Sequence, residues 1–188
     1  MLLRVVADLE AVTRDNGAGK TTLLRMLAGT EMPDTGEVKA GHGLRIGYYA
    51  QEHETIDMDR SLLEVMRSAA PDSTDTELRR ILWAFLFSGE TVDQRAGTLS
   101  GGERTRLAMA TLVVSGANVL LLDEPTNNLD PASREQVLEA LRTYAGAIVL
   151  VTHDEGAVAA LEPDRVLLLP DGDEDLWNDD YADLVALA

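Results

Sequence analysis

The sequence contains no cysteine, which excludes a disulfide framework and any metal site built from thiolates. Its apolar runs fall far short of the roughly 18 residues that a membrane-spanning helix needs, and no signal-peptide pattern opens the chain. Basic residues are also scarce: 16 lysine and arginine residues face 33 aspartate and glutamate residues, for a net charge of −17. This charge opposes unaided binding to a nucleic-acid backbone or an anionic membrane. We therefore expect a cytoplasmic protein with no membrane span and no direct DNA binding.

The 188 residues, of which 45% are hydrophobic, are enough for one domain with a real core. The acidic charge is concentrated at the end of the chain, where nine acidic residues and one basic residue, Arg165, follow from Glu162 onward. This end does not resemble an RNA-binding tail. We expect one strand over 165–169, and then an acidic tail that ends in a short amphipathic turn.

The stretch from Val119 to Asp130 organises the rest of the chain. Its unbroken apolar run predicts a strand buried on both faces of a parallel sheet, and Asp123-Glu124 follows where that strand ends. Open α/β sheets bind ligands at that end. Asp123 could hold a hydrated Mg²⁺, and Glu124 could polarise a water for attack on a phosphoryl group. The alternative is a strand that simply ends in an acidic turn.

Near the start, the chain reads like the end of a phosphate-binding loop that opens a helix. The loop pattern calls for glycine at position 14, where this chain has Arg14. Its small residues would let backbone N–H groups face phosphates, Lys20 would reach the terminal phosphates, and the Thr21 hydroxyl would ligate Mg²⁺. The strand expected before the loop, Val5-Val6-Ala7, is short. The expected nucleotide-binding residues here are Asn16, Gly17, Ala18, Gly19, Lys20, Thr21 and Thr22.

Two further polar residues follow predicted strands. Residues 44–50 read as a strand that leads to Gln51, whose amide could sense Mg²⁺ or the attacking water. Residues 147–151 form another apolar strand, and His153 lies at its exit. A surface glutamine and a structural histidine are the alternatives. Sharing a sheet edge with Asp123-Glu124 favours a contact between His153 and the γ-phosphate.

Helical patterns occupy residues 61–89, and we expect a small helical subdomain over about residues 60–115. Capping boxes are predicted at Ser61, at Thr74 and again at Ser100, where Glu103 lies three residues later. Gly101 and Gly102 would leave bare N–H groups at the positive end of that helix. The alternative is a helix cap with no ligand. Beyond the organising stretch, Asp130 is predicted to cap a further helix with Pro131 in its first turn.

These motifs together resemble the ATP-binding-cassette ATPases, in the order and spacing of that family and over nearly the whole chain. Residues 16–21 match the phosphate loop, Gln51 the Q-loop, residues 99–103 the signature, residues 119–124 the Walker B strand, residues 129–130 the D-loop, and His153 the switch histidine. The resemblance implies a P-loop α/β cassette with a mostly parallel sheet flanked by helices. It also implies head-to-tail pairing, in which two ATP molecules each lie between one phosphate loop and the opposite signature. The implied ligands are ATP and Mg²⁺.

Within this superfamily, Glu103 and the run from Arg104 to Leu107 look like the ABC-F group, as do residues 125–130 and 175–181. Members of that group carry two cassettes in one chain and act on ribosomes in translation or antibiotic resistance. The resemblance implies that residues 1–188 are one cassette, matched to the C-terminal one and truncated at its N-terminal side. Its partner would be a second cassette in the same chain or a second copy.

The resemblance also assigns roles across the pair. Ser100, Gly101, Gly102 and Glu103 would reach the partner's nucleotide, Asp130 of the D-loop would bind nucleotide as well, and Gln51 would touch the Mg²⁺ held by Thr21 and Asp123. Two rival readings stay open at this point. One is a transporter subunit that drives a membrane partner, which the 49 positions from Gln51 to Ser100 do not distinguish. The other is a folded cassette that does not use ATP, because Arg14 replaces a glycine and residues 1–13 contain no aromatic residue to stack on adenine.

Overall fold

The computed structural model describes residues 9–13, 19–50, 56–127, 129–178, 180–181 and 185, with only the backbone described for residues 9–13. The fold separates into two compact units. The first unit is drawn from residues 1–49, 118–125 and 145–188 and holds the β-sheet. The second is drawn from residues 50–117 and 126–144 and is helical.

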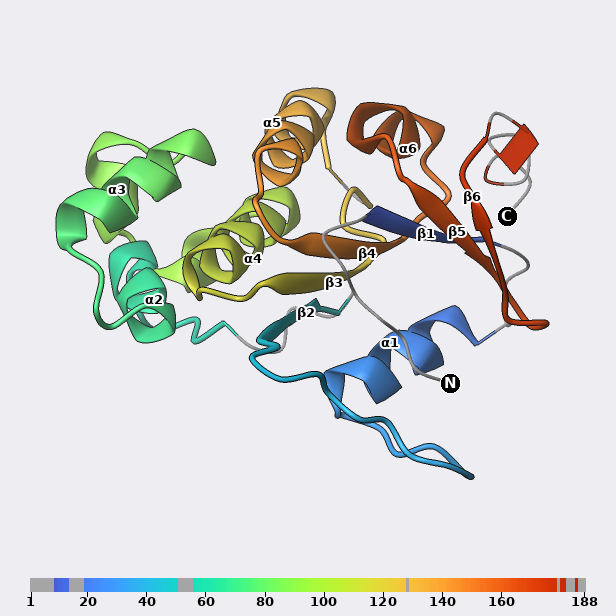
Figure 1. The fold of residues 1–188 in the computed structure, drawn as a ribbon. Helices are drawn as coiled ribbons and strands as arrows, with labels where there is room; N and C mark the ends of the chain where they lie inside the picture. The colour runs from blue at the N-terminus through green and yellow to red at the C-terminus, as the bar shows by residue number, and fades with distance from the viewer. Residues whose placement is uncertain are drawn as a thin grey trace. The chain divides into compact units, whose positions relative to one another are not determined.

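The first unit is built on a six-stranded sheet with the strand order β2-β3-β4-β1-β5-β6 (Figure 1). Neighbouring strands from β2 to β5 are parallel, and β6 runs antiparallel to β5. A mostly parallel sheet with helices confirms the predicted α/β fold class. The strands are β1 (Leu9–Thr13), β2 (Ile46–Tyr49), β3 (Val119–Asp123), β4 (Ala147–Val151), β5 (Arg165–Leu168) and β6 (Asp173–Leu176).

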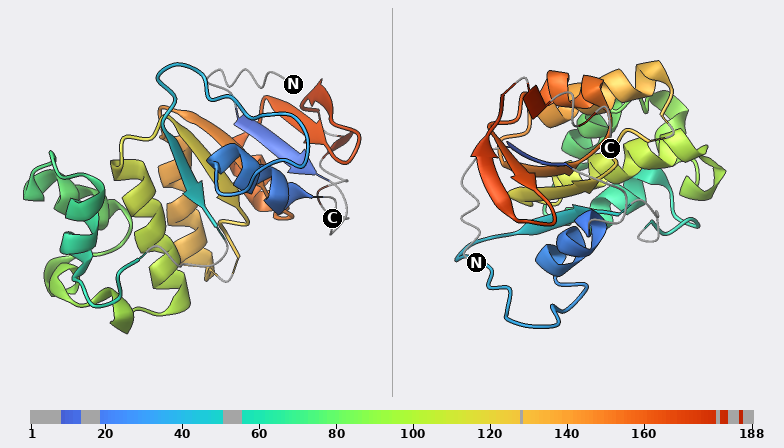
Figure 2. Two further views of the ribbon diagram at one scale, coloured as in Figure 1. Left: turned by 90° about the horizontal axis from the view of Figure 1, so that it is seen from below. Right: turned by 90° about the vertical axis from the view of Figure 1, so that its right-hand side faces the viewer.

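Both faces of the central strands are covered. Every residue of β3 and β4 is buried, as their unbroken apolar runs predict. Val119 and Leu121 pack with Leu24 of α1 (Lys20–Ala28) on one face, and α6 (Glu155–Leu161) lies on the other face (Figure 2). Leu24 is fully buried, and a side chain of that kind stabilises a fold by about 1.5–3 kcal/mol.

The strand β1 precedes the phosphate loop in the chain. It pairs with β4 on one side and with β5 on the other, which places it inside the sheet. The predicted leading segment Val5-Val6-Ala7 lies outside the described residues. The helix α1 ends at Gly29, as the sequence predicts. Gly29 takes the left-handed conformation with a φ of 74°, and its N–H donates to carbonyl oxygens in the last turn of the helix.

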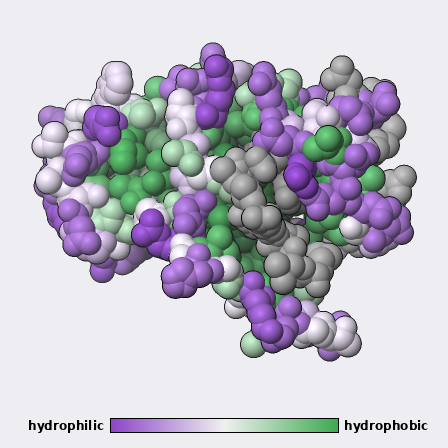
Figure 3. All heavy atoms as spheres, viewed as in Figure 1, coloured by the Kyte–Doolittle hydropathy of each residue, from purple (hydrophilic) through white to green (hydrophobic). Residues whose placement is uncertain are grey.

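The acidic end of the chain forms a strand that the sequence did not predict. The sequence predicts an acidic tail with a short amphipathic turn after residue 169 and no further strand, whereas the structure has β6 there, paired with β5 in a hairpin. All four residues of β6 are exposed, so its side chains carry no alternating apolar pattern that would reveal a strand. Hydrophilic side chains gather over this strand (Figure 3).

The second unit consists of helices with well-formed N-terminal caps. The capping boxes predicted at Ser61, Thr74 and Ser100 are all present, and Asp130 caps the last helix of this unit with Pro131 in its first turn. None of the helices in the described part of the chain is long and apolar enough to cross a membrane. The elements are α2 (Leu62–Ala69), α3 (Asp75–Ala84), the short 3₁₀ helices η1 (Gly89–Asp93) and η2 (Ala96–Thr98), α4 (Gly101–Val114) and α5 (Pro131–Arg142).

A close backbone approach holds the segment that leads into α4. The N–H of Gly97 donates to the carbonyl oxygen of Met58 at 2.9 Å, and a Cβ at Gly97 would stand 2.9 Å from the same oxygen. We expect Gly97→Ala to lower the free energy of unfolding by about 1–3 kcal/mol, because the added methyl forces this contact apart. Urea denaturation measures the difference.

The matched control is Gly41→Ala, because a Cβ at Gly41 meets no atom within 4 Å and its backbone is not in the left-handed region. Equal stabilities for the two variants would contradict the close-approach explanation.

Candidate functional site

The carboxyl ends of neighbouring parallel strands meet along one edge of the sheet. The register pairs Asp123 of β3 and Val12 of β1 with the same residue of β4, Val151. Tyr49, at the end of β2, pairs with Leu122. The strands β3 and β4 thus end at the same level, β2 ends one residue before it and β1 one residue after it, so the segments that follow leave the sheet from adjacent positions.

Two of the predicted residues are in direct contact at this edge. His153 Nδ1 lies 2.9 Å from Glu124 Oε1, and the His153 backbone N–H donates to Glu124 Oε2 at 3.4 Å. An ionised carboxylate can only accept, so Nδ1 donates in this hydrogen bond and Nε2 is left for a ligand. The Glu124 side chain is 14% exposed and the His153 side chain 54% exposed, which leaves the pair accessible from solvent.

The backbone of Glu124 turns sharply as the chain leaves β3. Its φ of 50° lies in the left-handed region, which costs a residue with a Cβ about 1–2 kcal/mol. The N–H of Glu124 donates to the Val151 carbonyl at 2.9 Å, so the turn is tied to the end of β4. This turn directs the carboxylate towards the segment that follows β4, where His153 lies.

The turn that carries His153 is fixed by hydrogen bonds on its far side. The Thr152 hydroxyl accepts from the N–H of Asp154, and the Asp154 carboxylate caps α6 by accepting from the N–H groups of Gly156 and Ala157. Thr152 is buried. The main chain on both sides of His153 is therefore fixed, and this limits the positions that the imidazole ring can take.

Asp123 is the last residue of β3 and is 3% exposed. A buried carboxylate is costly unless a polar or charged partner compensates for its lost hydration, and a bound cation is such a partner. The described residues contain no cluster of three or more His, Cys, Asp or Glu side chains able to enclose a metal. A hydrated Mg²⁺ needs only one or two protein oxygens together with phosphates, so the donor set present here, the Asp123 carboxylate and the Thr21 hydroxyl, fits that ion.

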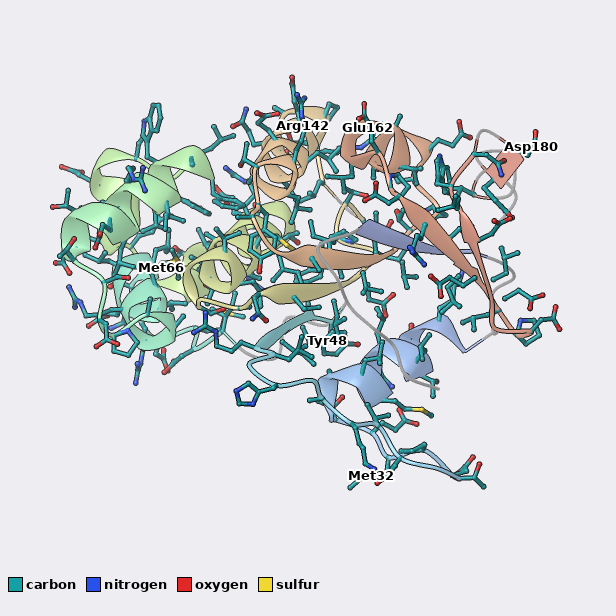
Figure 4. The ribbon with its side chains drawn as sticks, in the orientation of Figure 1. Met32, Tyr48, Met66, Arg142, Glu162 and Asp180 are labelled. Carbon is teal, nitrogen blue, oxygen red and sulfur yellow. The ribbon has the colours of Figure 1, made fainter. Side chains whose placement is uncertain are left out.

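Tyr48 of β2 is a second buried polar group on this side of the sheet, and its importance was not predicted from the sequence. It packs into the core cluster that includes Leu24 of α1, and it lies between β2 and α1 in Figure 4. Burial raises the pKa of the Tyr48 phenol above its ordinary value of 10.0, and the negative charge of Asp123 raises it further. Arg25 opposes the rise, but its guanidinium does not reach hydrogen-bonding geometry with the hydroxyl oxygen.

The start of α1 has the form expected at the end of a phosphate loop. Gly19 has a φ of 90° and supplies no side chain to cap the helix, so the first N–H groups of α1 have no such cap. Lys20 is the first residue of the helix, and Thr21 and Thr22 follow in its first turn. A positively polarised helix end of this kind favours an anion. The remaining predicted loop residues Asn16, Gly17 and Ala18, together with Arg14 and Gln51, lie outside the described residues.

The predicted signature residues belong to the second unit and begin α4. The Ser100 hydroxyl accepts from the N–H of Glu103, while Glu103 Oε2 accepts from the Ser100 N–H at 2.8 Å and from its hydroxyl at 2.7 Å. Gly101 occupies the first turn, and a Cβ added there would meet no atom within 4 Å, so this face of the turn is open. The capping box holds the signature turn in shape without covering Gly101.

Arg106 is a buried residue that holds the first turn of α4 in place, and the sequence did not predict this role. It is 9% exposed, donates to the Phe85 carbonyl at 3.0 Å and stacks over the Phe87 ring at 5.0 Å. Its other terminal nitrogen lies 3.9 Å from Glu103. Arg106 thereby links α4 to the end of α3, and the only sequence signal for it is its place one turn after the capping glutamate.

Asp130, predicted to bind nucleotide as part of the D-loop, uses its carboxylate within its own helix. It accepts from the N–H groups of Ala132 and Ser133, each at 3.1 Å, and from the Ser133 hydroxyl at 2.5 Å. These bonds, led by the one from the Ser133 hydroxyl, hold the pKa of Asp130 below its ordinary value of 3.8. The side chain therefore fixes the start of α5.

Comparison with known sequences gives one family. The sequence profile described as "ABC transporter" matches residues 11–127. YheS of Haemophilus influenzae is 44% identical over 140 residues, which cover 74% of this chain and 22% of YheS. ABC transporter F family member 5 of Arabidopsis thaliana is 36% identical over 91% of this chain and 25% of its own length. ATP-binding cassette sub-family F member 3 of Rattus norvegicus is 40% identical over 81% of this chain and 22% of its own length. The chain thus spans about a quarter of the length of these relatives or less.

Comparison with solved structures agrees on the fold. A dimer of the ATP-binding cassette MJ0796 bound to ADP and Pi superposes with a TM-score of 0.75, over 94% of this chain and 88% of the cassette. At 19% sequence identity this likeness shows the fold alone. The archaeal ribosome recycling factor aABCE1, solved with the ribosomal stalk protein aP1, has a TM-score of 0.73 at 26% identity, over 89% of this chain and 33% of that factor. The predicted cassette fold is confirmed.

The capping box at the start of α4 makes stability depend on pH. Hydrogen bonds from the Ser100 backbone and hydroxyl hold the pKa of Glu103 below its ordinary value of 4.5. A lowered pKa contributes stability above pH 4.5 that is lost as the pH falls through the value in the folded protein. We expect the wild type to lose more unfolding free energy on acidification below pH 4.5 than Glu103→Gln, because glutamine can complete the capping box without titrating.

Urea denaturation at a series of pH values measures the difference between the two proteins. The other two capping glutamates, Glu64 and Glu77, titrate in both proteins and cancel. Identical pH dependence of wild type and variant would show that Glu103 makes no such contribution.

Proposed function

Because the chain belongs to the ATP-binding-cassette family, and within it to the ABC-F group, we propose that it binds ATP with Mg²⁺ and hydrolyses ATP when paired with a second cassette. The observation that carries this proposal is the Glu124–His153 pair, which stands at the carboxyl edge of the sheet directly after the buried Asp123. A carboxylate that can take a proton, a histidine with one free ring nitrogen and a carboxylate suited to Mg²⁺ are the groups that phosphoryl transfer to water requires.

Binding of the triphosphate falls to the loop before α1 and to the first turn of that helix. Lys20 supplies a positive charge for the terminal phosphates. The N–H groups of Gly19, Thr21 and Thr22 would face the phosphates, helped by the dipole of α1, and Asn16, Gly17 and Ala18 are proposed to complete the phosphate loop. Most of the affinity for the phosphates arises here.

Mg²⁺ would be held by the Thr21 hydroxyl and the Asp123 carboxylate, and Gln51 would sense its presence. The ion supplies charge neutralisation between the phosphates and orients the terminal one. The buried position of Asp123 strengthens its interaction with any cation, since the surroundings have a low dielectric constant.

Hydrolysis requires a base for the attacking water, and Glu124 has that role. The carboxylate would accept the proton of the water as the water oxygen bonds to the γ-phosphorus and the bond from that phosphorus to the β-phosphate oxygen breaks, with ADP as the leaving group. His153 uses Nε2 to bind the γ-phosphate while Nδ1 stays oriented by Glu124. Gln51 orients the same water through its amide.

The second half of each nucleotide site comes from a partner cassette. Ser100, Gly101 and Gly102 at the start of α4 present N–H groups and a hydroxyl to the nucleotide of the partner, with Glu103 holding their conformation. Asp130 fixes the neighbouring segment at the interface. The dimeric arrangement of the MJ0796 cassette supports pairing of this kind.

For the whole protein, we propose a cytoplasmic factor that acts on the ribosome in translation or antibiotic resistance. The F-family names of two relatives and the structural likeness to an archaeal ribosome recycling factor support this proposal. Residues 1–188 then form one cassette, with residues 60–115 as its helical subdomain. Co-purification of the full-length protein with ribosomes, rather than with a membrane protein, separates this role from that of a transporter subunit.

The role of Glu124 leads to a direct test. We expect Glu124→Gln to slow ATP turnover by about 10²–10⁴-fold, a barrier change of about 3–5 kcal/mol, because the amide cannot accept the proton of the attacking water. ATP affinity should be retained, since glutamine keeps the size and the position of the side chain. Phosphate release and calorimetric ATP titration measure the two quantities.

The matched control is Glu162→Gln, which removes an equal charge at an exposed position in the same unit. This control should turn over ATP like the wild type. Normal turnover by Glu124→Gln would refute the assigned role of Glu124.

A further inference from the structure

The hydroxyl of Tyr48 is a buried polar group that lies near the Arg25 guanidinium but makes no hydrogen bond of good geometry with it. Its oxygen is inaccessible to solvent and has no hydrogen-bond partner among the described residues. A phenylalanine would fill the same space in the core without burying a polar atom, so an unpaired hydroxyl lowers stability compared with that residue. A group retained at such a cost in a structured core calls for an explanation, and a partner that arrives with a ligand provides one.

The sheet register places this tyrosine beside Asp123. Tyr48 of β2 is paired with Leu121 of β3, and Asp123 lies two residues further along the same strand. Residues two apart on a strand point to the same face, so Tyr48, Leu121 and Asp123 share the face that α1 covers. Diagonal neighbours on adjacent strands come within reach of an aromatic side chain.

The charges around the Tyr48 hydroxyl favour one orientation of its O–H bond. Tyr48 interacts electrostatically with the cation of Arg25 and with the anion of Asp123. Such a hydroxyl is most stable with its oxygen turned towards the guanidinium and its hydrogen towards the carboxylate. The one buried carboxylate proposed to hold Mg²⁺ therefore has a donor on its own face of the sheet.

We propose that Tyr48 is the positioning residue of the Mg²⁺ site, whose hydroxyl donates a hydrogen bond to the Asp123 carboxylate when ATP and Mg²⁺ are bound. This inference rests on the proposed function. It assigns Tyr48 no contact with the reacting atoms. The hydrogen bond would fix which carboxylate oxygen faces the metal, as partners of metal ligands commonly do.

The test is the Tyr48→Phe variant, compared with wild type in ATP binding by calorimetry over a range of Mg²⁺ concentrations and again in EDTA. We expect the Mg²⁺ concentration at half-saturation to rise by about 10–100-fold, the usual effect of losing the partner of a metal ligand. Binding of ATP in EDTA should be unchanged. The melting temperature without ligand should be equal to that of wild type or higher, because the variant buries no unpaired hydroxyl.

The matched control is Tyr49→Phe, which removes the hydroxyl of the adjacent tyrosine on the opposite face of β2. Its half-saturation by Mg²⁺ should match that of wild type. An unchanged Mg²⁺ dependence in Tyr48→Phe, with wild type binding ATP in a Mg²⁺-dependent manner, would overturn the role of Tyr48 and leave the proposed function standing.

Two other outcomes also decide the matter. A Tyr48→Phe protein that melts earlier and binds ATP more weakly in EDTA as well would show that the hydroxyl is structural, which overturns the inference. A wild-type chain that binds no ATP under any of these conditions would overturn the proposed function itself, and the role of Tyr48 with it.

Discussion

The parallel register of β1, β3 and β4 is the constraint on which the candidate site depends. Because Val12 and Asp123 are both level with Val151, the segments after three strands that are far apart in the sequence begin at one edge of the sheet. The hydrogen bond between Glu124 and His153 is the direct product of this register. A shift of β3 against β4 by one residue would turn Asp123 to the opposite face and break that contact.

The groups with proposed functions are also those that the fold holds in unfavourable states. Glu124 has a positive φ, Asp123 is a buried carboxylate, and Tyr48 buries a hydroxyl with no hydrogen-bond partner among the described residues. The first helical turn after Gly19 has no side-chain cap. By contrast, the three helices of the second unit that carry capping boxes have their first turns satisfied within the chain. The proposed site thus contains local strain and unsatisfied polarity, as many functional sites do, although Leu86 and Glu162, which are not part of it, also have a positive φ.

Sequence patterns were sufficient for elements whose signal is local. The apolar runs of β3 and β4 predicted strands buried on both faces, and the spacing of Ser100 and Glu103 predicted a capping box that is present. The sequence also predicted that Glu124 and His153 share an edge, because the carboxyl ends of parallel strands must meet there. The strand β6 was missed, since all its residues are exposed and it is held by backbone pairing with β5 and by the ion pair between Arg165 and Glu174, which leave no apolar pattern in the sequence. Tyr48 was missed for another reason: its neighbours Asp123 and Arg25 are brought to it only by the register of the sheet and the packing of α1.

The most direct measurement is a crystal structure of the chain with Mg²⁺ and a non-hydrolysable ATP analogue. We predict that the terminal phosphate lies between the Lys20 amine and His153 Nε2, with Mg²⁺ on the Asp123 carboxylate and the Glu124 carboxylate facing the phosphorus. A triphosphate bound on another face of the molecule, remote from the Glu124–His153 pair, would contradict the assignment of this sheet edge as the nucleotide site.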